Sequence, residues 1–314
     1  MWEPSRDANA LIDEFLAGYY GPAAWPLRRY IDRMDDAVSR SGAAMHCYAQ
    51  DTSAWLELGD LNEAAALFGE AEKAVAGDPV LSVRVRRARL PLDYAWLNRY
   101  PALKCVARLR QQPFAGPADP AAACEEFIKI CNGFNVGQYA EGNPFKNIES
   151  VLRARFRTPT PPPELCRNLP EDQWVDIQDN EFRLAGPGDW AQLADDPAAS
   201  DGKAARMPSN HVQWAVQYGI SADIAALGAI HCCVAVRCDA KAQSGNACVL
   251  GLYDAKAKAP VAQRVLTIEE TRDKYAVIDL GVHQLNDDMY VWVAPMNNPA
   301  EVDAVFVDRI FFAR

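Results

Sequence analysis

The 314-residue chain has few histidines and no regular cysteine pattern. Its four histidines are His46, His211, His231 and His283, and its nine cysteines include no C-x-x-C pair. Zinc sites need such ligands at close spacing, and an odd, irregular set of cysteines does not build a disulfide framework. We therefore expect neither a zinc site nor a fold held together by disulfides.

Long apolar runs and an excess of positive charge are also missing. No run of about 18 apolar residues occurs, so no membrane-spanning helix is expected. The first residues, MWEPSRDANALIDEF, carry acids where a signal peptide has its apolar core. We expect no signal peptide in this chain, and the compartment stays open. The net charge of −10 disfavours nucleic acid as a partner but does not penalise neutral ligands such as sugars.

The apolar residues that are present follow a helical period up to about residue 156. The first expected helix ends at Gly21-Pro22, and Asp60 with Glu63 suggests a capping box before the third. The pair 61–76 and 79–100 resembles one tetratricopeptide-type hairpin, but no further copies follow. The sequence therefore predicts an irregular helical bundle, with helices over about 8–19, 22–41, 61–76, 79–100, 121–133 and 147–156.

A proline-rich stretch, RTPTPPPELC, covers 157–166 and predicts an extended linker. After it the apolar period changes to two, in short runs rich in Val, Ile and aromatic residues. Expected strands are 174–177, 182–185, 212–218, 231–238, 247–253, 261–266, 275–280, 289–294 and 304–312. The predicted fold class is thus α+β in two domains: a helical bundle over 1–156, the linker, and an antiparallel β-sandwich (jelly roll) over 167–314.

Three motifs in the first half resemble a known protein family: W-x-P-x-x-D at the start, EFLAGYYGPAA from residue 14, and WLELGD from residue 55. They are similar to the segment that follows the catalytic barrel in large bacterial glycoside-hydrolase-like proteins, distant relatives of α-glucuronidases and β-hexosaminidases. The helical region of that family has no known function. The resemblance implies that a catalytic (β/α) barrel precedes this chain in the parent protein and holds the catalytic carboxylates. It also implies a secreted or periplasmic parent.

The second half resembles carbohydrate-binding modules of families 6 and 35 and galactose-binding-like sandwiches. The resemblance rests on the layout DNEFRLA (179–185), the turn ASDGK (199–203) and the closing strand VDRI (307–310). Such modules often hold a structural calcium near their first and last strands. The resemblance places Gln178, Asn180 and Asp308 at that site, or Asp179 and Glu181 in another register. Two amides replace two acids here, so Asp308 could instead be a polar anchor for the first strand.

No motif for hydrolysis stands out in the sequence. A glycosidase needs two carboxylates about 5–10 Å apart, but adjacent acids on a helix or strand point in different directions. The pairs Asp35-Asp36, Glu125-Glu126, Asp195-Asp196 and Asp287-Asp288 are better interpreted as solvated surface charge. There is no G-x-S-x-G motif either. We do not expect this chain to be catalytic alone, although its parent resembles a glycoside hydrolase.

Aromatic residues are the better candidates for carbohydrate contact, because a sugar packs its apolar face on a ring. Tyr19, Tyr20 and Trp25 gather around the break at Gly21-Pro22, either facing a barrel or filling the bundle core. In the sandwich, Trp190, His211 and Trp214 are the candidates near loops. Trp214, Tyr218, Tyr253, Tyr290 and Trp292 have strand-like positions, for which core burial is the default.

These observations predict the non-catalytic C-terminal part of a carbohydrate-active protein: a helical support domain and an accessory sandwich that binds glycan. One alternative is a protein–protein interaction module; another is a self-contained glycosidase with a site between the domains. The expected partners are a poly- or oligosaccharide and the barrel, with neither nucleic acid nor membrane. The apolar first helix also predicts a homodimer. No cofactor is expected other than a structural calcium.

Overall fold

The computed structural model describes residues 5–43, 51–157 and 160–314. Trp2 and Pro4 of the opening motif, and also His46 and Cys47, lie outside these residues. The chain divides into two compact units, which we describe separately. The first comprises Met1–Leu103 and Arg110–Phe156, and the second comprises Lys104–Leu109 and Arg157–Arg314.

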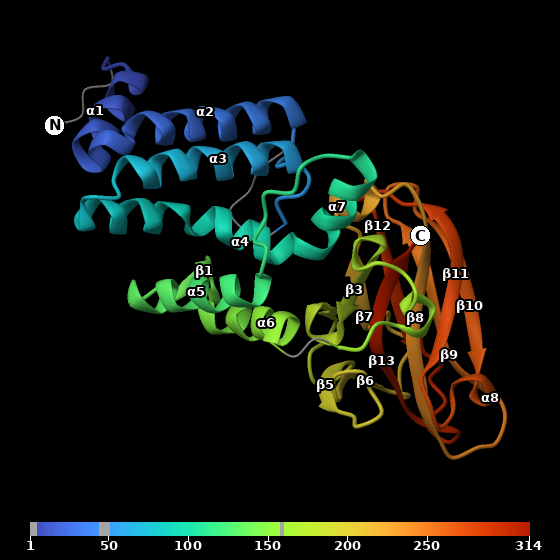
Figure 1. Ribbon diagram of the computed structural model, residues 1–314. Helices are drawn as coiled ribbons and strands as arrows, with labels where there is room; N and C mark the ends of the chain where they lie inside the picture. The colour runs from blue at the N-terminus through green and yellow to red at the C-terminus, as the bar shows by residue number, and fades with distance from the viewer. Residues whose placement is uncertain (1–4, 44–50, 158–159) are drawn as a thin grey trace. The chain divides into compact units, whose positions relative to one another are not determined.

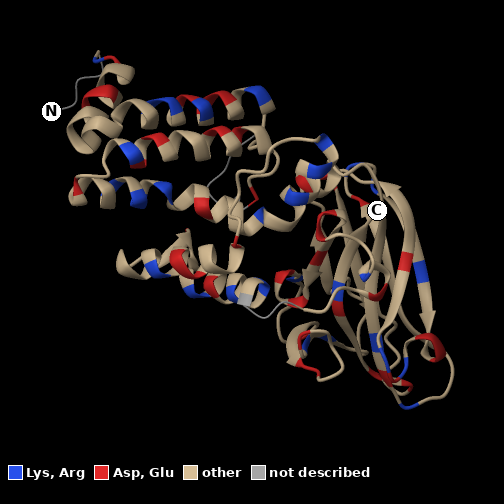
Figure 2. Ribbon diagram, viewed as in Figure 1, with Lys and Arg blue, Asp and Glu red and all other residues tan. Residues whose placement is uncertain are grey.

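The first unit is an irregular helical bundle, as the sequence predicts (Figure 1). Acidic and basic residues are interspersed along α2, whereas the charged residues of α3 are mostly acidic and those of α4 mostly basic (Figure 2). None of the described helices is long and apolar enough to cross a lipid bilayer. The helices are α1 (Ala8–Tyr20), α2 (Ala24–Ser41), α3 (Leu58–Ala74), α4 (Pro79–Arg110), α5 (Pro120–Gly133) and α6 (Phe145–Arg157), with a 3-10 turn η1 (Gly21–Ala23) and a small hairpin of β1 (Gln138–Ala140) and β2 (Asn143–Pro144).

Helix α3 begins earlier than the sequence predicts, so the expected capping box of Asp60 and Glu63 is wrong. Glu57 is the N-cap and Asp60 is its capping-box partner, with its carboxylate 3.1 Å from the Glu57 N–H. The physical reason is burial: Asp60 is 2 % exposed and accepts hydrogen bonds from Arg33 and Arg40. These arginines hold the carboxylate inside, which fixes the start of the helix one turn earlier.

Helix α4 also runs further than expected, continuing past Tyr100 to Arg110 through Pro101. A proline inside a helix costs about 3 kcal/mol, so a compensating interaction is needed. The extension buries Leu103, Cys105 and Val106, each at most 3 % exposed. Burying side chains of this size offsets a cost of that order.

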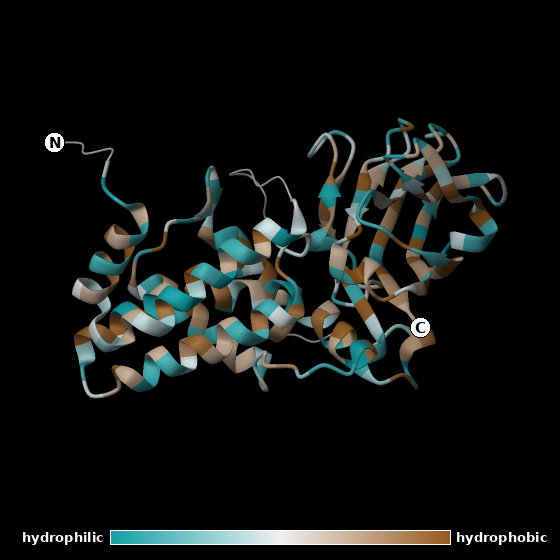
Figure 3. Ribbon diagram, turned by 90° about the horizontal axis from the view of Figure 1, so that it is seen from above, coloured by the Kyte–Doolittle hydropathy of each residue, from teal (hydrophilic) through white to brown (hydrophobic). Residues whose placement is uncertain are grey.

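The second unit is an antiparallel sandwich, and its strands alternate hydrophobic and hydrophilic residues (Figure 3). One sheet has the order β10-β9-β12-β7-β4; the other has the order β11-β8-β13-β6-β5, with β3 also paired to β13. The strands are β3 (Trp174–Gln178), β4 (Arg183–Leu184), β5 (Gln192–Asp195), β6 (Lys203–Pro208), β7 (Val216–Gly219), β8 (Ala229–Ala240), β9 (Asn246–Asp254), β10 (Ala259–Thr267), β11 (Ala276–Gln284), β12 (Met289–Pro295) and β13 (Val302–Ala313). Short helices α7 (Ala222–Ala225), α8 (Ile268–Thr271), η2 (Glu164–Cys166), η3 (Glu171–Gln173) and η4 (Asp179–Glu181) connect them.

The long strands lie where the sequence predicts them. The sequence-based prediction did not include β5 and β6, and it started β7 at residue 212 instead of Val216. Strands β5 and β6 contain mostly small and polar residues, so they lack the Val, Ile and aromatic signal. Residues 211–215 belong to no strand, and β7 begins only at Val216.

The described part of the proline-rich segment packs on the second unit. Cys166 is fully buried in a small cluster with Cys233, Phe311 and Ala313. The Arg309 guanidinium donates to the Pro161 carbonyl at 2.9 Å. Residues 160–166 therefore contribute to the core and polar contacts of the sandwich.

Candidate functional site

The five-stranded sheet carries one row of residues that crosses all its strands. Cross-strand register places Arg183 opposite Gln217, Gln217 opposite Trp292, Trp292 opposite Gly251, and Gly251 opposite Gln263. Directly opposed residues on neighbouring strands point to the same side of a sheet. The row therefore lies on one face, which we call the aromatic face after the rings described next.

The aromatic face points away from the sandwich core. On β12 and β9 the alternate residues Val291, Val293, Leu250 and Leu252 are fully buried, so the opposite parity faces outward. The outward-facing residues include Trp292 in the row. Two residues further along the same strands they include Tyr290 and Tyr253, which lie opposite each other.

Trp214 completes the site from the segment before β7. Its ring stacks on Trp292 with centroids 4.0 Å apart and an interplanar angle of 10°. Its centroid also lies 5.3 Å from that of Tyr253 and 6.1 Å from that of Tyr290. Trp292 is thus covered, whereas Trp214, Tyr253 and Tyr290 remain partly exposed. The result is a surface of three accessible rings, of which Trp214 covers the buried Trp292.

Two neighbours fix these rings. The Gln217 side-chain amide donates to the Trp214 carbonyl at 2.9 Å, which holds the Trp214 segment over the sheet. A Cβ atom at Gly251 would lie 2.5 Å from the Ala262 carbonyl oxygen and 3.2 Å from Trp292 Nε1, so only glycine leaves room for the indole. Trp292 Nε1 is buried and has no hydrogen-bond partner among the described residues.

Trp190 and His211 form a separate pair in the loops of the sandwich. Their ring centroids lie 6.3 Å apart, and Trp190 is 38 % exposed. His211 Nε2 lies 3.0 Å from the Trp190 carbonyl, while Nδ1 accepts from the Gln213 N–H at 3.1 Å. Nε2 therefore carries the proton, and burial lowers the pKa of His211, which keeps the ring neutral. This histidine joins two loops, and the Trp190 ring beside it is partly exposed.

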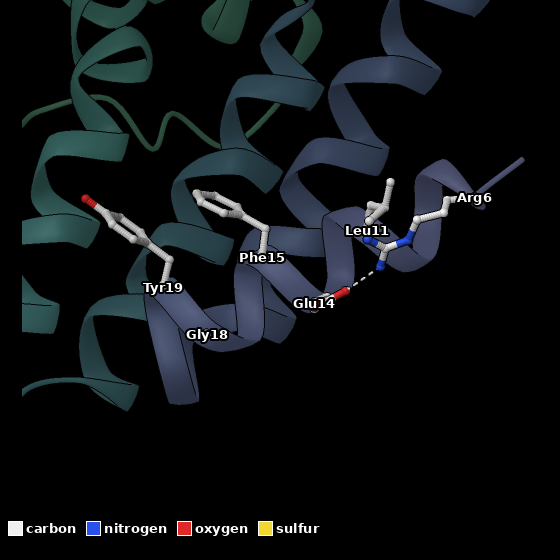
Figure 4. Close-up of a pocket in the computed structure, with 6 residues that line it drawn as sticks. All are labelled: Arg6, Leu11, Glu14, Phe15, Gly18 and Tyr19. Carbon is white, nitrogen blue, oxygen red and sulfur yellow. Dashed lines mark hydrogen bonds and ion pairs between the residues drawn. The ribbon is translucent and has the colours of Figure 1, made fainter. Parts of the chain in front are cut away.

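Tyr19 borders a shallow hollow of about 470 Å³ on α1, where its ring stacks on Phe15 with centroids 5.3 Å apart (Figure 4). The Tyr20 ring meets that of Tyr19 edge-on, with centroids 4.9 Å apart. Arg84 covers the Tyr19 ring at 4.3 Å from its centroid. Trp25 is 69 % exposed and makes no ring contact with these tyrosines among the described residues. Tyr19 and Trp25 thus lie at the surface of the bundle rather than in its core.

Gln178 and Asp308, two of the three expected calcium ligands, lie together where β3 pairs with β13. Ser200 joins them: its N–H and hydroxyl donate to Asp308 Oδ1 at 3.0 and 2.7 Å, and its Oγ lies 3.3 Å from Gln178 Oε1. The turn at Ser200 thus lies directly beside Asp308. Asn180 lies in η4, and among the described residues its side chain makes no hydrogen bond to Gln178 or Asp308.

Asp179, from the alternative register, is the buried acid of this region. It is 1 % exposed, and neither carboxylate oxygen has a hydrogen-bond partner among the described residues. Burial, with the negative charges of Asp201 and Asp308, raises its pKa to about 7. No group of three or more His, Cys, Asp or Glu side chains within the described residues is placed to hold a metal ion. The calcium site stays a prediction.

The adjacent acids expected at the surface differ in their roles. Glu125, Glu126 and Asp195 form ion pairs with Arg153, Lys129 and Lys203. Asp196, however, is 3 % exposed and binds Arg237 at 2.8 Å and the Tyr275 hydroxyl at 2.5 Å. The interpretation of Asp196 as solvated charge was wrong, because the turn it begins is held against β8.

The comparisons with known proteins give only remote structural similarity. No family model matches the chain, and neither does any curated protein. The CBM22-1 xylan-binding domain of Paenibacillus barcinonensis Xyn10C aligns with 44 % of this chain and 92 % of its own length, at 7 % identity and a TM-score of 0.33. The C-terminal family 22 carbohydrate-binding module of Clostridium thermocellum Xyn10B aligns with 45 % of this chain and 85 % of its own length, at 14 % identity and a TM-score of 0.28. The arabinose-bound α-L-arabinofuranosidase MgGH51 aligns with 45 % of this chain and 23 % of its own length, at 17 % identity and a TM-score of 0.27.

Proposed function

We propose that the chain is a carbohydrate-binding accessory protein and that the aromatic face of its sandwich is the binding surface. The observation that carries the proposal is a group of three partly exposed rings, Trp214, Tyr253 and Tyr290, in which Trp214 stacks on the buried Trp292. Preorganised rings bind the apolar face of a sugar without losing side-chain entropy on binding. The amides of Gln217 and Gln263 flank them and can bond to hydroxyl groups.

The proposed role is binding rather than hydrolysis. The row on the aromatic face contains no carboxylate, whereas glycosidases place two across the scissile bond. The helical unit would support a catalytic barrel in a parent glycoside-hydrolase-like protein, as the resemblance of its motifs implies. We expect no release of nitrophenol from aryl glycosides by the purified chain.

The test of the proposal replaces Trp214 with alanine and measures binding to a polysaccharide panel by affinity electrophoresis. Removing the ring that covers Trp292 should weaken binding at least tenfold, which corresponds to about 1.4 kcal/mol. Trp25→Ala is the matched control, since Trp25 is an exposed tryptophan on the other unit and should leave affinity unchanged. Absence of binding to every polysaccharide would reject the function.

A second function, protein association, is favoured by the exposed apolar face of α1. Leu11, Phe15 and Tyr19 lie along it at 37 %, 57 % and 36 % exposure, and they border the hollow at Gly18 (Figure 4). Exposed apolar groups of this kind often mark association surfaces. We expect a concentration-dependent dimer in sedimentation velocity that Phe15→Asp abolishes. A wild-type chain that stays monomeric at all concentrations would contradict this second function.

A further inference from the structure

An exposed arginine stands at one end of the row on the aromatic face. Arg183 lies directly opposite Gln217, so it shares the face of Trp292 two strands away. Neighbouring strands lie about 4.8 Å apart, which places the Cα atoms of Arg183 and Trp292 roughly 10 Å apart. The extended arginine side chain can therefore reach a ligand that rests on the rings.

Arg183 is free to bind such a ligand. Among the described residues, no hydrogen bond or ion pair engages its guanidinium. Three other arginines of the sandwich are paired instead: Arg237, Arg264 and Arg309 pair with Asp196, Glu270 and Asp176, respectively. An unpaired guanidinium on a surface of neutral groups is a site for an anion.

The rest of the row is neutral, so the positive charge of the row lies at its Arg183 end. Gln217, Gly251 and Gln263 carry no charge, so no acid of the row competes for Arg183. A ligand carboxylate on this face would thus be attracted toward Arg183, the charged end of the row.

We infer that the aromatic face takes an acidic glycan, one with a uronic acid unit, whose carboxylate binds Arg183 while a neighbouring ring packs on Trp214. This inference rests on the proposed function. A planar guanidinium matches a carboxylate with two parallel hydrogen bonds, and such charge-assisted bonds are stronger than neutral ones. The chain's net charge of −10 repels polyanions in general, so the preference would come from this local contact.

The experiment compares acidic polysaccharides with the same polymers after carboxyl reduction, which turns each carboxylate into a neutral hydroxymethyl group. Glucuronoxylan and polygalacturonate are the probes, and the wild-type full chain is titrated calorimetrically at low and high salt. We expect at least one acidic polymer to bind about tenfold more tightly than its reduced form, with the difference shrinking as salt screens the charges. Arg183→Gln should remove the difference without weakening binding to the reduced polymer.

Arg264→Gln is the matched control, because Arg264 is an exposed arginine of the same sheet that pairs with Glu270 at 2.8 Å. It should preserve the preference for the acidic form. Equal affinity for acidic and reduced polymers, or an unchanged preference in Arg183→Gln, would overturn the inference while leaving the glycan-binding function intact. Failure of both forms to bind, with wild-type folding verified by circular dichroism, would reject the proposed function itself.

Discussion

Single buried acids in the sandwich make its stability depend on pH, and Asp179 is the clearest case. In the unfolded chain an aspartate has a pKa of about 3.9, whereas burial raises the pKa of Asp179 to about 7 in the folded protein. Because the pKa of Asp179 is higher in the folded than in the unfolded protein, its contribution to stability is fully present below about pH 4. That contribution is lost as the pH rises through about 7.

We therefore expect Asp179→Asn to raise the melting temperature by several degrees at pH 8 and to change it little at pH 4. Thermal melts of the wild type and the variant across this range measure the effect. The comparison isolates Asp179 from Asp176, whose pKa burial also raises, to about 6. A lower melting temperature at pH 8 would show instead that the carboxylate is needed as an anion, as a calcium ligand would be.

Asp308 tests the calcium prediction at the same scale. Asp308→Ala removes the acceptor of two Ser200 hydrogen bonds and should cost about 1–3 kcal/mol of unfolding free energy. Urea denaturation with and without chelator measures the loss, and Asp308→Asn, which keeps an acceptor oxygen, should lose less. A structural calcium predicts that chelation also lowers stability. An unchanged midpoint on chelation, with the alanine variant destabilised, would leave Asp308 as a hydrogen-bonding anchor only.

At the scale of elements, α3 depends on the buried cap at its start. Asp60→Ala removes the bond to the Glu57 N–H and leaves Arg33 and Arg40 without their buried partner, so we expect a loss of about 3 kcal/mol. The control is Glu63→Ala, because Glu63 is half exposed and, within the described residues, forms an ion pair with Arg33 alone. That change should cost at most about 0.5 kcal/mol in guanidinium denaturation. Equal losses would mean that Asp60 acts merely as one surface charge.

For the whole molecule, we propose that the sandwich starts at Thr160. A fragment of residues 160–314 keeps the buried Cys166 and the bond from Arg309 to the Pro161 carbonyl, while a fragment of 167–314 loses both. We expect the shorter fragment to be less stable by about 2 kcal/mol, or roughly 4–8 °C for a chain of this size. Calorimetry of the two fragments measures the difference. Indistinguishable melting temperatures would place the boundary at 167, as the proline pattern alone suggests.

The sequence by itself determined the two-part α+β organisation, because the apolar period of a helix differs from that of a strand over any long segment. It also determined the long strands β8, β9 and β12, and the resemblance to carbohydrate-binding modules placed Gln178 near Asp308. Short or polar elements escaped it, since β5 and β6 are stabilised by neighbours far away in the chain rather than by local propensity.

The candidate site was decided by tertiary structure. Strand parity alone does not say which face of β12 meets the core, so Tyr290 and Trp292 had core burial as their default interpretation. The register between β7, β12 and β9 brings them together with Trp214 and Tyr253 on the outward face. No pattern in the sequence marked Arg183 as a candidate ligand-binding residue, because its place on the aromatic face depends on its pairing with Gln217. Long-range pairing of strands sets both facts, and no local pattern in the sequence records it.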